Sequence, residues 1–153
     1  MESVFKLFRG KSDVRTGSFF GIELEIEGVR IADTEDASFL RHSRVVEDHS
    51  LRGGIEIVTN PLPLKDVSEF AKAYEAWARE RSPVITERCS THIHVNAQDM
   101  TYEQLRSFLW LSVAVEGVLM EYCSDWRRNN TYCYLNHTTT NTVQWLRELL
   151  LRS

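Results

Sequence analysis

The chain has 153 residues, enough for one domain with a substantial core, and we expect a single domain over residues 1–153. Its formal net charge is −4 at pH 7, with acidic and basic residues interspersed, which gives no electrostatic reason to expect nucleic acid as a partner. The three cysteines predict no disulfide framework, and no apolar run is long enough for a membrane span, so we expect a cytoplasmic protein with no membrane partner.

The first predicted strand covers residues 18–28. Its central part alternates strictly between apolar and acidic side chains, which is typical of a half-buried strand with a period of two. The apolar face carries Ile22, Leu24 and Ile26, and the other face carries Glu23, Glu25 and Glu27. Residues 28–42 are then predicted to be the end of the strand and a polar excursion.

Two further extended runs are predicted within residues 43–63. Gly53 and Gly54 separate them, either as a turn or as a bulge where another group approaches closely. Pro61 and Pro63 end the second run, because proline cannot donate a hydrogen bond to a strand ladder.

Helical periodicity begins at Asp66, where Asp66 and Glu69 resemble a capping box, and it should end near Ser82-Pro83. "CSTHIHVN" (89–96) returns to a period of two. A second helix of about 20 residues should follow a cap made by Thr101 and Gln104, and its wide apolar surface predicts that it is largely buried. A polar connection and a short helix around "TVQWLRELLL" close the chain.

Strands that alternate between apolar and polar residues favour an antiparallel sheet with helices packed on one face, and therefore an α+β fold. The opposite face would then gather acidic and imidazole side chains from three separate segments. The members of this group are Glu23, Glu25, Glu56, His92 and His94.

Clustered carboxylates repel one another unless a cation or a proton lies between them, and oxygen ligands with one imidazole suit Mg²⁺ or Mn²⁺. Arg52 could supply a positive fork for a phosphate or a carboxylate. Each segment alone is better explained as the solvent-facing side of a sheet, and only their joint occurrence favours a site. A zinc site is disfavoured, since Cys89 lies at an odd offset from His92 and should face the other way.

"GIELEIEG" (21–28), "VVEDHSLRGGIEIVTNPLP" (45–63) and "CSTHIHVN" (89–96), in this order, resemble motifs of the amidoligase family. This family belongs with the carboxylate–amine ligases related to glutamine synthetase and glutamate–cysteine ligase. Its genes are often carried by bacteriophages. If this chain is encoded by a phage, the expected location is the cytoplasm of the bacterial host. A weaker likeness appears at "RRNNTYC" (127–133).

The resemblance implies a curved, glutamine-synthetase-like half-funnel that binds ATP and Mg²⁺, with Mn²⁺ as a substitute, and joins a small-molecule or peptide carboxylate to an amine through an acyl phosphate. It implies metal binding by Glu23, Glu25, Glu56 and His92. It further implies catalytic roles for Arg52, Glu56 and His94, and cofactor or substrate contacts from Arg52, Asn96, Arg127 and Tyr132.

Two departures separate the chain from the family pattern. Ser90 stands where a glycine is common, and a later strand that completes the nucleotide site is missing, with Gln144 where a glutamate is expected. The chain therefore resembles a short or truncated member with an open half-funnel, which a second copy of the chain could complete. Two alternatives stay open: a binding protein with the same fold and no activity, and a metal-dependent hydrolase that uses His92, His94 and Glu23 or Glu25.

Overall fold

The computed structural model describes residues 17–123, 125, 144 and 148. The chain divides into two compact units, one formed by residues 15–96 and the other by residues 1–14 and 97–153. The first unit contains the sheet and one long helix, and the second contains another long helix; each is described here by itself. None of the helices in the described part combines the length and the apolar character that a membrane crossing requires.

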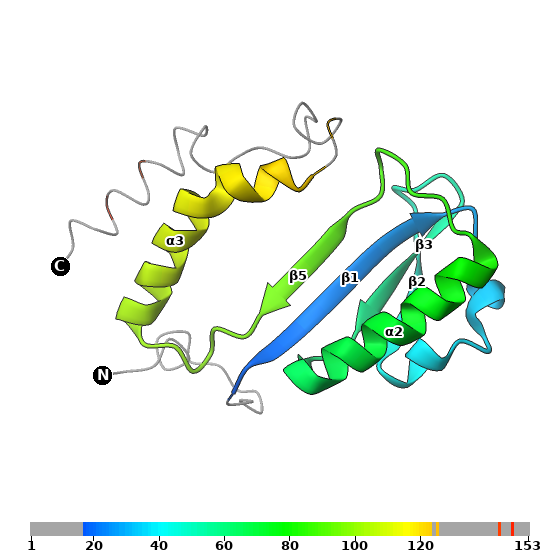
Figure 1. Cartoon of the computed structure of the whole chain (residues 1–153), viewed down its shortest axis with the longest axis horizontal. Helices are drawn as coiled ribbons and strands as arrows, with labels where there is room; N and C mark the ends of the chain where they lie inside the picture. Colours follow the sequence, from blue (N-terminus) through cyan, green and yellow to red (C-terminus); the bar gives the residue numbers. More distant parts are fainter. Residues whose placement is uncertain (1–16, 124, 126–143, 145–147, 149–153) are drawn as a thin grey trace. The chain divides into compact units, whose positions relative to one another are not determined.

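The sheet is antiparallel throughout, with β1 (Phe19–Glu27) at its centre (Figure 1). One side of β1 pairs with β3 (Gly54–Thr59), which pairs in turn with β2 (Ser43–Asp48). The other side of β1 pairs with β5 (Thr91–Val95). The short strand β4 (Leu62–Pro63) pairs with the beginning of β1. The expected α+β fold with an antiparallel sheet is confirmed, and the glutamine-synthetase-like half-funnel stays a prediction.

The break between β3 and β4 is closed by a side chain. β3 ends at Thr59, and the chain re-forms a strand only at Leu62, after Pro61. The buried Thr59 hydroxyl accepts a hydrogen bond of 2.8 Å from the amide of Ile22, which satisfies a donor of β1 where the ladder is interrupted.

The glycine pair at the β2–β3 connection makes a turn and a close approach, and Gly54 pairs with Glu27 and Asp48 in an uninterrupted register, without a bulge. Gly53 has a positive φ of 65°, which suits a turn. Gly54 faces Glu27 across the ladder so closely that an added Cβ would collide with the carbonyl oxygen of Ile26. The turn residue and the close approach are therefore adjacent.

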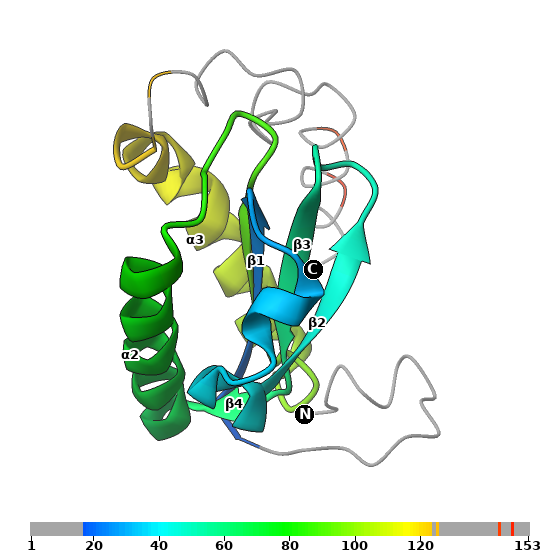
Figure 2. The same ribbon diagram turned by 90° about the vertical axis from the view of Figure 1, so that its right-hand side faces the viewer.

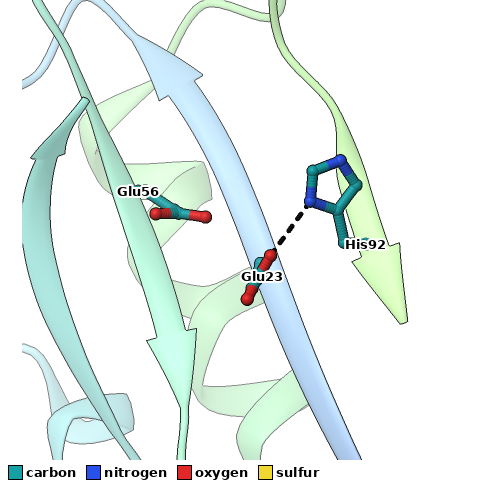
Figure 3. Close-up of side chains that lie close together, drawn as sticks. All are labelled: Glu23, Glu56 and His92. Carbon is teal, nitrogen blue, oxygen red and sulfur yellow. Dashed lines mark hydrogen bonds and ion pairs between the residues drawn. The ribbon is translucent and has the colours of Figure 1, made fainter. Parts of the chain in front are cut away.

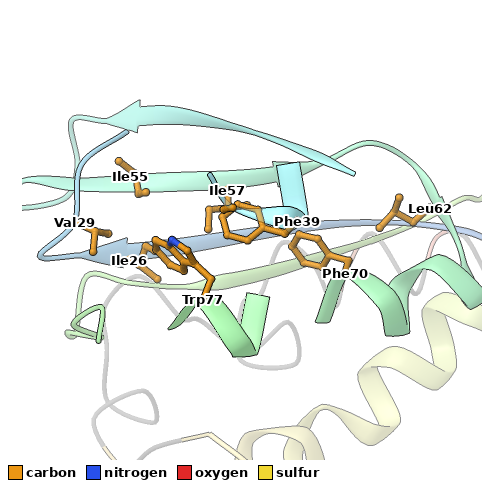
Figure 4. Packing of buried hydrophobic residues seen from close by; sticks show 9 residues of the cluster. Ile26, Val29, Phe39, Ile55, Ile57, Leu62, Phe70 and Trp77 are labelled. Atoms are coloured by element: carbon orange, nitrogen blue, oxygen red, sulfur yellow. The ribbon is translucent and has the colours of Figure 1, made fainter. Parts of the chain in front are cut away.

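Helix α2 (Leu64–Arg81) covers the apolar face of the sheet (Figure 2). Its Phe70 and Trp77 pack against a surface built by Ile26, Ile55 and Ile57 (Figure 4). The helix ends at Ser82, as expected, in the left-handed conformation. The expected capping box is wrong: the helix begins earlier, after Pro63, and Glu69 binds Arg41 instead.

The expectation of a strand end and a polar excursion at residues 28–42 is also wrong. Two short 3₁₀ helices, η1 (Ile31–Thr34) and η2 (Ser38–Arg41), fold this segment back over the core. Phe39 in η2 is fully buried and makes edge-on contacts with Phe70 and Trp77, at centroid distances of 6.2 and 5.4 Å. One aromatic residue in a polar segment thus supplies the centre of the core.

Helix α3 (Tyr102–Glu121) has the predicted length, and its cap is confirmed: the Thr101 hydroxyl accepts a hydrogen bond from the Gln104 amide. The prediction that it is largely buried is wrong, because none of its residues is buried and Leu111 and Val118 are each 61% exposed. An apolar surface predicts only that burial would be favourable. The apolar surface does not predict which other element would cover the helix. Most of the predicted final helix lies outside the described residues.

Candidate metal centre

The strand register brings acidic and imidazole residues together on the sheet face opposite α2. Glu23 of β1 pairs with His92 of β5, and Glu25 of β1 pairs with Glu56 of β3. Paired residues of an antiparallel ladder project to the same side, so all four side chains share one face. Figure 3 shows Glu23 between the other two members of the group, Glu56 and His92.

Glu23, Glu56 and His92 form the most compact group, which we call the trio. Each offers one ligand atom, and these atoms lie within 4.8 Å of one another. Two carboxylate oxygens and one imidazole nitrogen are a ligand set that suits Mn²⁺ and is compatible with Mg²⁺. The residues therefore fit a divalent cation by chemistry and by spacing. The trio contains three of the four predicted ligands, and metal binding by them stays a prediction.

Glu23 is the hub of the polar contacts on this face. Nδ1 of His92 lies 3.0 Å from its Oε2, and Nε2 of His94 lies 3.1 Å from its Oε1. The hydrogen bond from His92 lowers the pKa of Glu23, His94 adds to the effect, and partial burial opposes it. Glu23 is thus held as a carboxylate.

Gly21 explains how His94 reaches Glu23. Gly21 pairs with His94 across the β1–β5 ladder, and a Cβ at Gly21 would lie 3.3 Å from the Cβ of His94. The missing side chain leaves room for the imidazole over β1, from where it contacts the carboxylate two residues further along the strand. The glycine therefore shapes the site.

Glu56 has the opposite electrostatic environment. Burial raises its pKa, and the charges of Glu23, Asp48 and Glu25 raise it further. No cationic side chain in the described part of the chain forms an ion pair with Glu56, whereas Glu23 has two imidazoles. A divalent cation would relieve this repulsion.

Ser90 is a site residue that the sequence analysis did not identify as functional. Its hydroxyl donates to Oε2 of Glu25 at 2.5 Å and lies 3.1 Å from Nε2 of His92. Glu25, the fourth predicted ligand, is therefore engaged by Ser90 and does not belong to the trio. The signal that could have identified Ser90 is its position two residues before His92, on the same side of an alternating segment.

Two exposed arginines come from β2 and from the loop that follows it. Arg52 is exposed in the β2–β3 loop, and its backbone amide donates to the buried carboxylate of Glu27 at 2.7 Å. Glu27, expected on the wet face, thus fixes the loop that carries Arg52. Arg44 was missed: it is exposed on β2 and pairs with Val58, on the same face as Glu56.

Of the remaining predicted contacts, only Asn96 lies among the described residues. The side-chain amide of Asn96 donates to the carbonyl of Gly17 at 3.0 Å, a contact that links the end of β5 to the start of β1. Arg127 and Tyr132 lie outside the described residues. Cys89 is buried, with its sulfur close to Thr86 and Val84.

A family model described as "Putative amidoligase enzyme" matches residues 34–151. The chain belongs to the amidoligase family. The match includes the strands that carry Glu56 and His92, and β1 with Glu23 precedes it. No curated protein and no solved structure matches this amidoligase-family chain.

Proposed function

We propose that the protein is an ATP- and Mg²⁺-dependent ligase that joins a carboxylate to an amine. The proposal is supported by membership of the amidoligase family together with one structural observation, the trio of Glu23, Glu56 and His92 on an open sheet face. Phosphoryl transfer from ATP requires a cation that bridges phosphate oxygens, and an acidic face without one would repel a nucleotide.

In this proposal the trio holds Mg²⁺, or Mn²⁺ in its place. When bound, the cation supplies a positive charge that neutralises the phosphates. Arg52, exposed on the loop that Glu27 fixes, is the proposed contact for phosphate oxygens, because a guanidinium offers a planar fork of donors. Glu23 serves two purposes: it binds the cation and it orients both imidazoles.

The proposed reaction has two steps. The substrate carboxylate attacks the γ-phosphorus of ATP, forming an acyl phosphate and releasing ADP. The amine then attacks the acyl carbon, loses a proton, and displaces inorganic phosphate to leave an amide or isopeptide bond. His94, held at 3.1 Å from Glu23, is the proposed acceptor for the proton of the amine.

Amino acids and peptides are the proposed source of both substrates. A second copy of the chain that completes the open site, and a cytoplasmic location, stay predictions. Because the trio could also activate a water molecule, a metal-dependent hydrolase remains the rival that the experiment has to separate.

The test is phosphate and ADP release by the purified chain with ATP, Mg²⁺ and a panel of amino acids and peptides. We expect release that needs both an acid and an amine and that falls to background in Glu23→Gln. Glu47→Gln is the matched control, since Glu47 is an exposed carboxylate on β2 that pairs with Ile55, a core residue, and so faces away from the trio. Hydrolysis of a peptide or ester without ATP would favour the hydrolase, and nucleotide binding without turnover would favour the inactive binding protein.

A further inference from the structure

The contacts of Ser90 form one link of a continuous chain of polar groups. From one end, the chain runs through His94, Glu23, His92, Ser90 and Glu25. Ser90 is the only member that is neither acidic nor basic, and it joins the two halves. Its role therefore differs from that of a solvent-exposed serine.

A serine hydroxyl has one proton to donate and can accept hydrogen bonds as well. The Ser90 hydroxyl donates that proton to Oε2 of Glu25. Toward Nε2 of His92, 3.1 Å away, its oxygen must then act as the acceptor, so the proton of that contact lies on Nε2. The arrangement leaves Nδ1 as the nitrogen of His92 that faces Glu23 (Figure 3).

We infer that Ser90 is a positioning residue that makes His92 bind the cation through Nδ1, and that Glu25 acts through Ser90 rather than as a ligand. This inference rests on the proposed function. A histidine that binds a metal usually donates its other N–H to a fixed acceptor, which sets the ring orientation and increases its basicity as a ligand. Here the acceptor is Ser90, and Glu25 orients Ser90. A cation bound at Nδ1 takes the place of the proton that this nitrogen shares with Glu23.

Three of the variants that test the inference change one hydroxyl group each. Ser90→Ala removes the hydroxyl, Ser90→Thr restores it, and Thr91→Ala removes the hydroxyl of the next residue. Thr91 is a matched control, because it is exposed and pairs with Leu24, on the opposite side of the strand from Ser90 and His92. Circular dichroism of each variant verifies the fold.

The first readout is Mn²⁺ affinity, measured by calorimetry on the full chain. We expect Ser90→Ala to weaken binding by about 10-fold or more, with Ser90→Thr and Thr91→Ala close to wild type. Glu25→Gln should lose less affinity than Glu23→Gln, because a glutamine oxygen still accepts the hydroxyl proton of Ser90. Equal losses in the two glutamine variants would show that Glu25 is a direct ligand and would overturn the inference.

The second readout identifies the nitrogen that binds. In NMR spectra of histidine-labelled protein loaded with an NMR-active cadmium isotope, we expect metal–nitrogen coupling to Nδ1 of His92 and a proton on Nε2. Coupling to Nε2, or unchanged affinity in Ser90→Ala, overturns the role of Ser90 while leaving the trio intact. A wild-type chain that binds no Mn²⁺ instead overturns the proposed metal site, and the inference with it.

Discussion

Glu25 and Glu56 are directly paired across the β1–β3 ladder, and Glu23 lies on the same face, two residues before Glu25 in β1. Like charges placed opposite each other destabilise a sheet. The fold accepts this cost at a position where a cation would remove it. If the proposed cation site exists, the same residues lower stability and bind the cation, and the predictions below separate the two effects.

We predict that Glu56→Gln stabilises the protein and weakens cation binding. Since the pKa of Glu56 is raised, the folded state binds a proton more readily than the unfolded state, and stability is lost as the pH rises from the ordinary value of 4.5 through the raised pKa. Removing the charge should therefore increase the free energy of unfolding at pH 7 by about 0.5 kcal/mol and have no effect below pH 4.5.

Urea unfolding and Mn²⁺ titration of the same samples measure both effects. The control is Glu47→Gln, which should change neither quantity. A Glu56→Gln variant that is less stable than wild type at pH 7 would refute the electrostatic account of this face.

Glu23→Gln should have the reverse effect on stability. The pKa of Glu23 is lowered, chiefly by the hydrogen bond from His92, so its carboxylate stabilises the fold above the ordinary value of 4.5, and this contribution is lost as the pH falls through the lowered pKa. We expect a loss of about 0.5 kcal/mol at neutral pH, and the difference from wild type should vanish in acid. Unfolding curves across this pH range measure it, and a difference that grows in acid would be inconsistent with the assignment.

Gly21→Ala should displace His94 from Glu23 without unfolding the protein. The added Cβ would lie 3.3 Å from the Cβ of His94, which is closer than most real contacts, and Gly21 does not have a positive φ. We expect the turnover of a working ligase to fall several-fold, because misplaced catalytic groups are costly. Gly117→Ala on α3, where an added Cβ meets nothing, is the control. The measurement is the turnover number of both variants relative to wild type. Equal turnover in the two variants would argue against a role for His94.

Phe39→Ala tests the core. The ring is fully buried among Phe70, Tyr74 and Trp77, so its removal should cost about 3–5 kcal/mol. Leu64→Ala, at a position that is 67% exposed, should cost less than about 0.5 kcal/mol. Thermal unfolding compares the two, and a mild effect at Phe39 would mean that η2 does not belong to the core.

The alternation of residues was sufficient to predict β1 and β5 and to assign Glu23 and His92 to the polar sides of their strands. It could not predict the register, and the register decides that Glu23 pairs with His92 while Glu25 pairs with Glu56. Register depends on turns and ladder breaks elsewhere in the sheet, such as the one that Thr59 closes.

Two misses have a common cause. Phe39 was overlooked because most of the segment around it is polar, and Glu27 was assigned to the solvent-facing side by its place in the alternation. Burial of both comes from distant segments, α2 for Phe39 and the β2–β3 loop for Glu27. Local pattern carries no information about such partners.

The most direct test of the central claim is the position of manganese in a crystal of the full chain grown with Mn²⁺ and a non-hydrolysable ATP analogue, located by its anomalous scattering. The account predicts a manganese ion coordinated by Glu23, Glu56 and Nδ1 of His92, with the nucleotide phosphates on the same sheet face. A manganese ion bound away from these three residues, or a nucleotide on another surface, would contradict it.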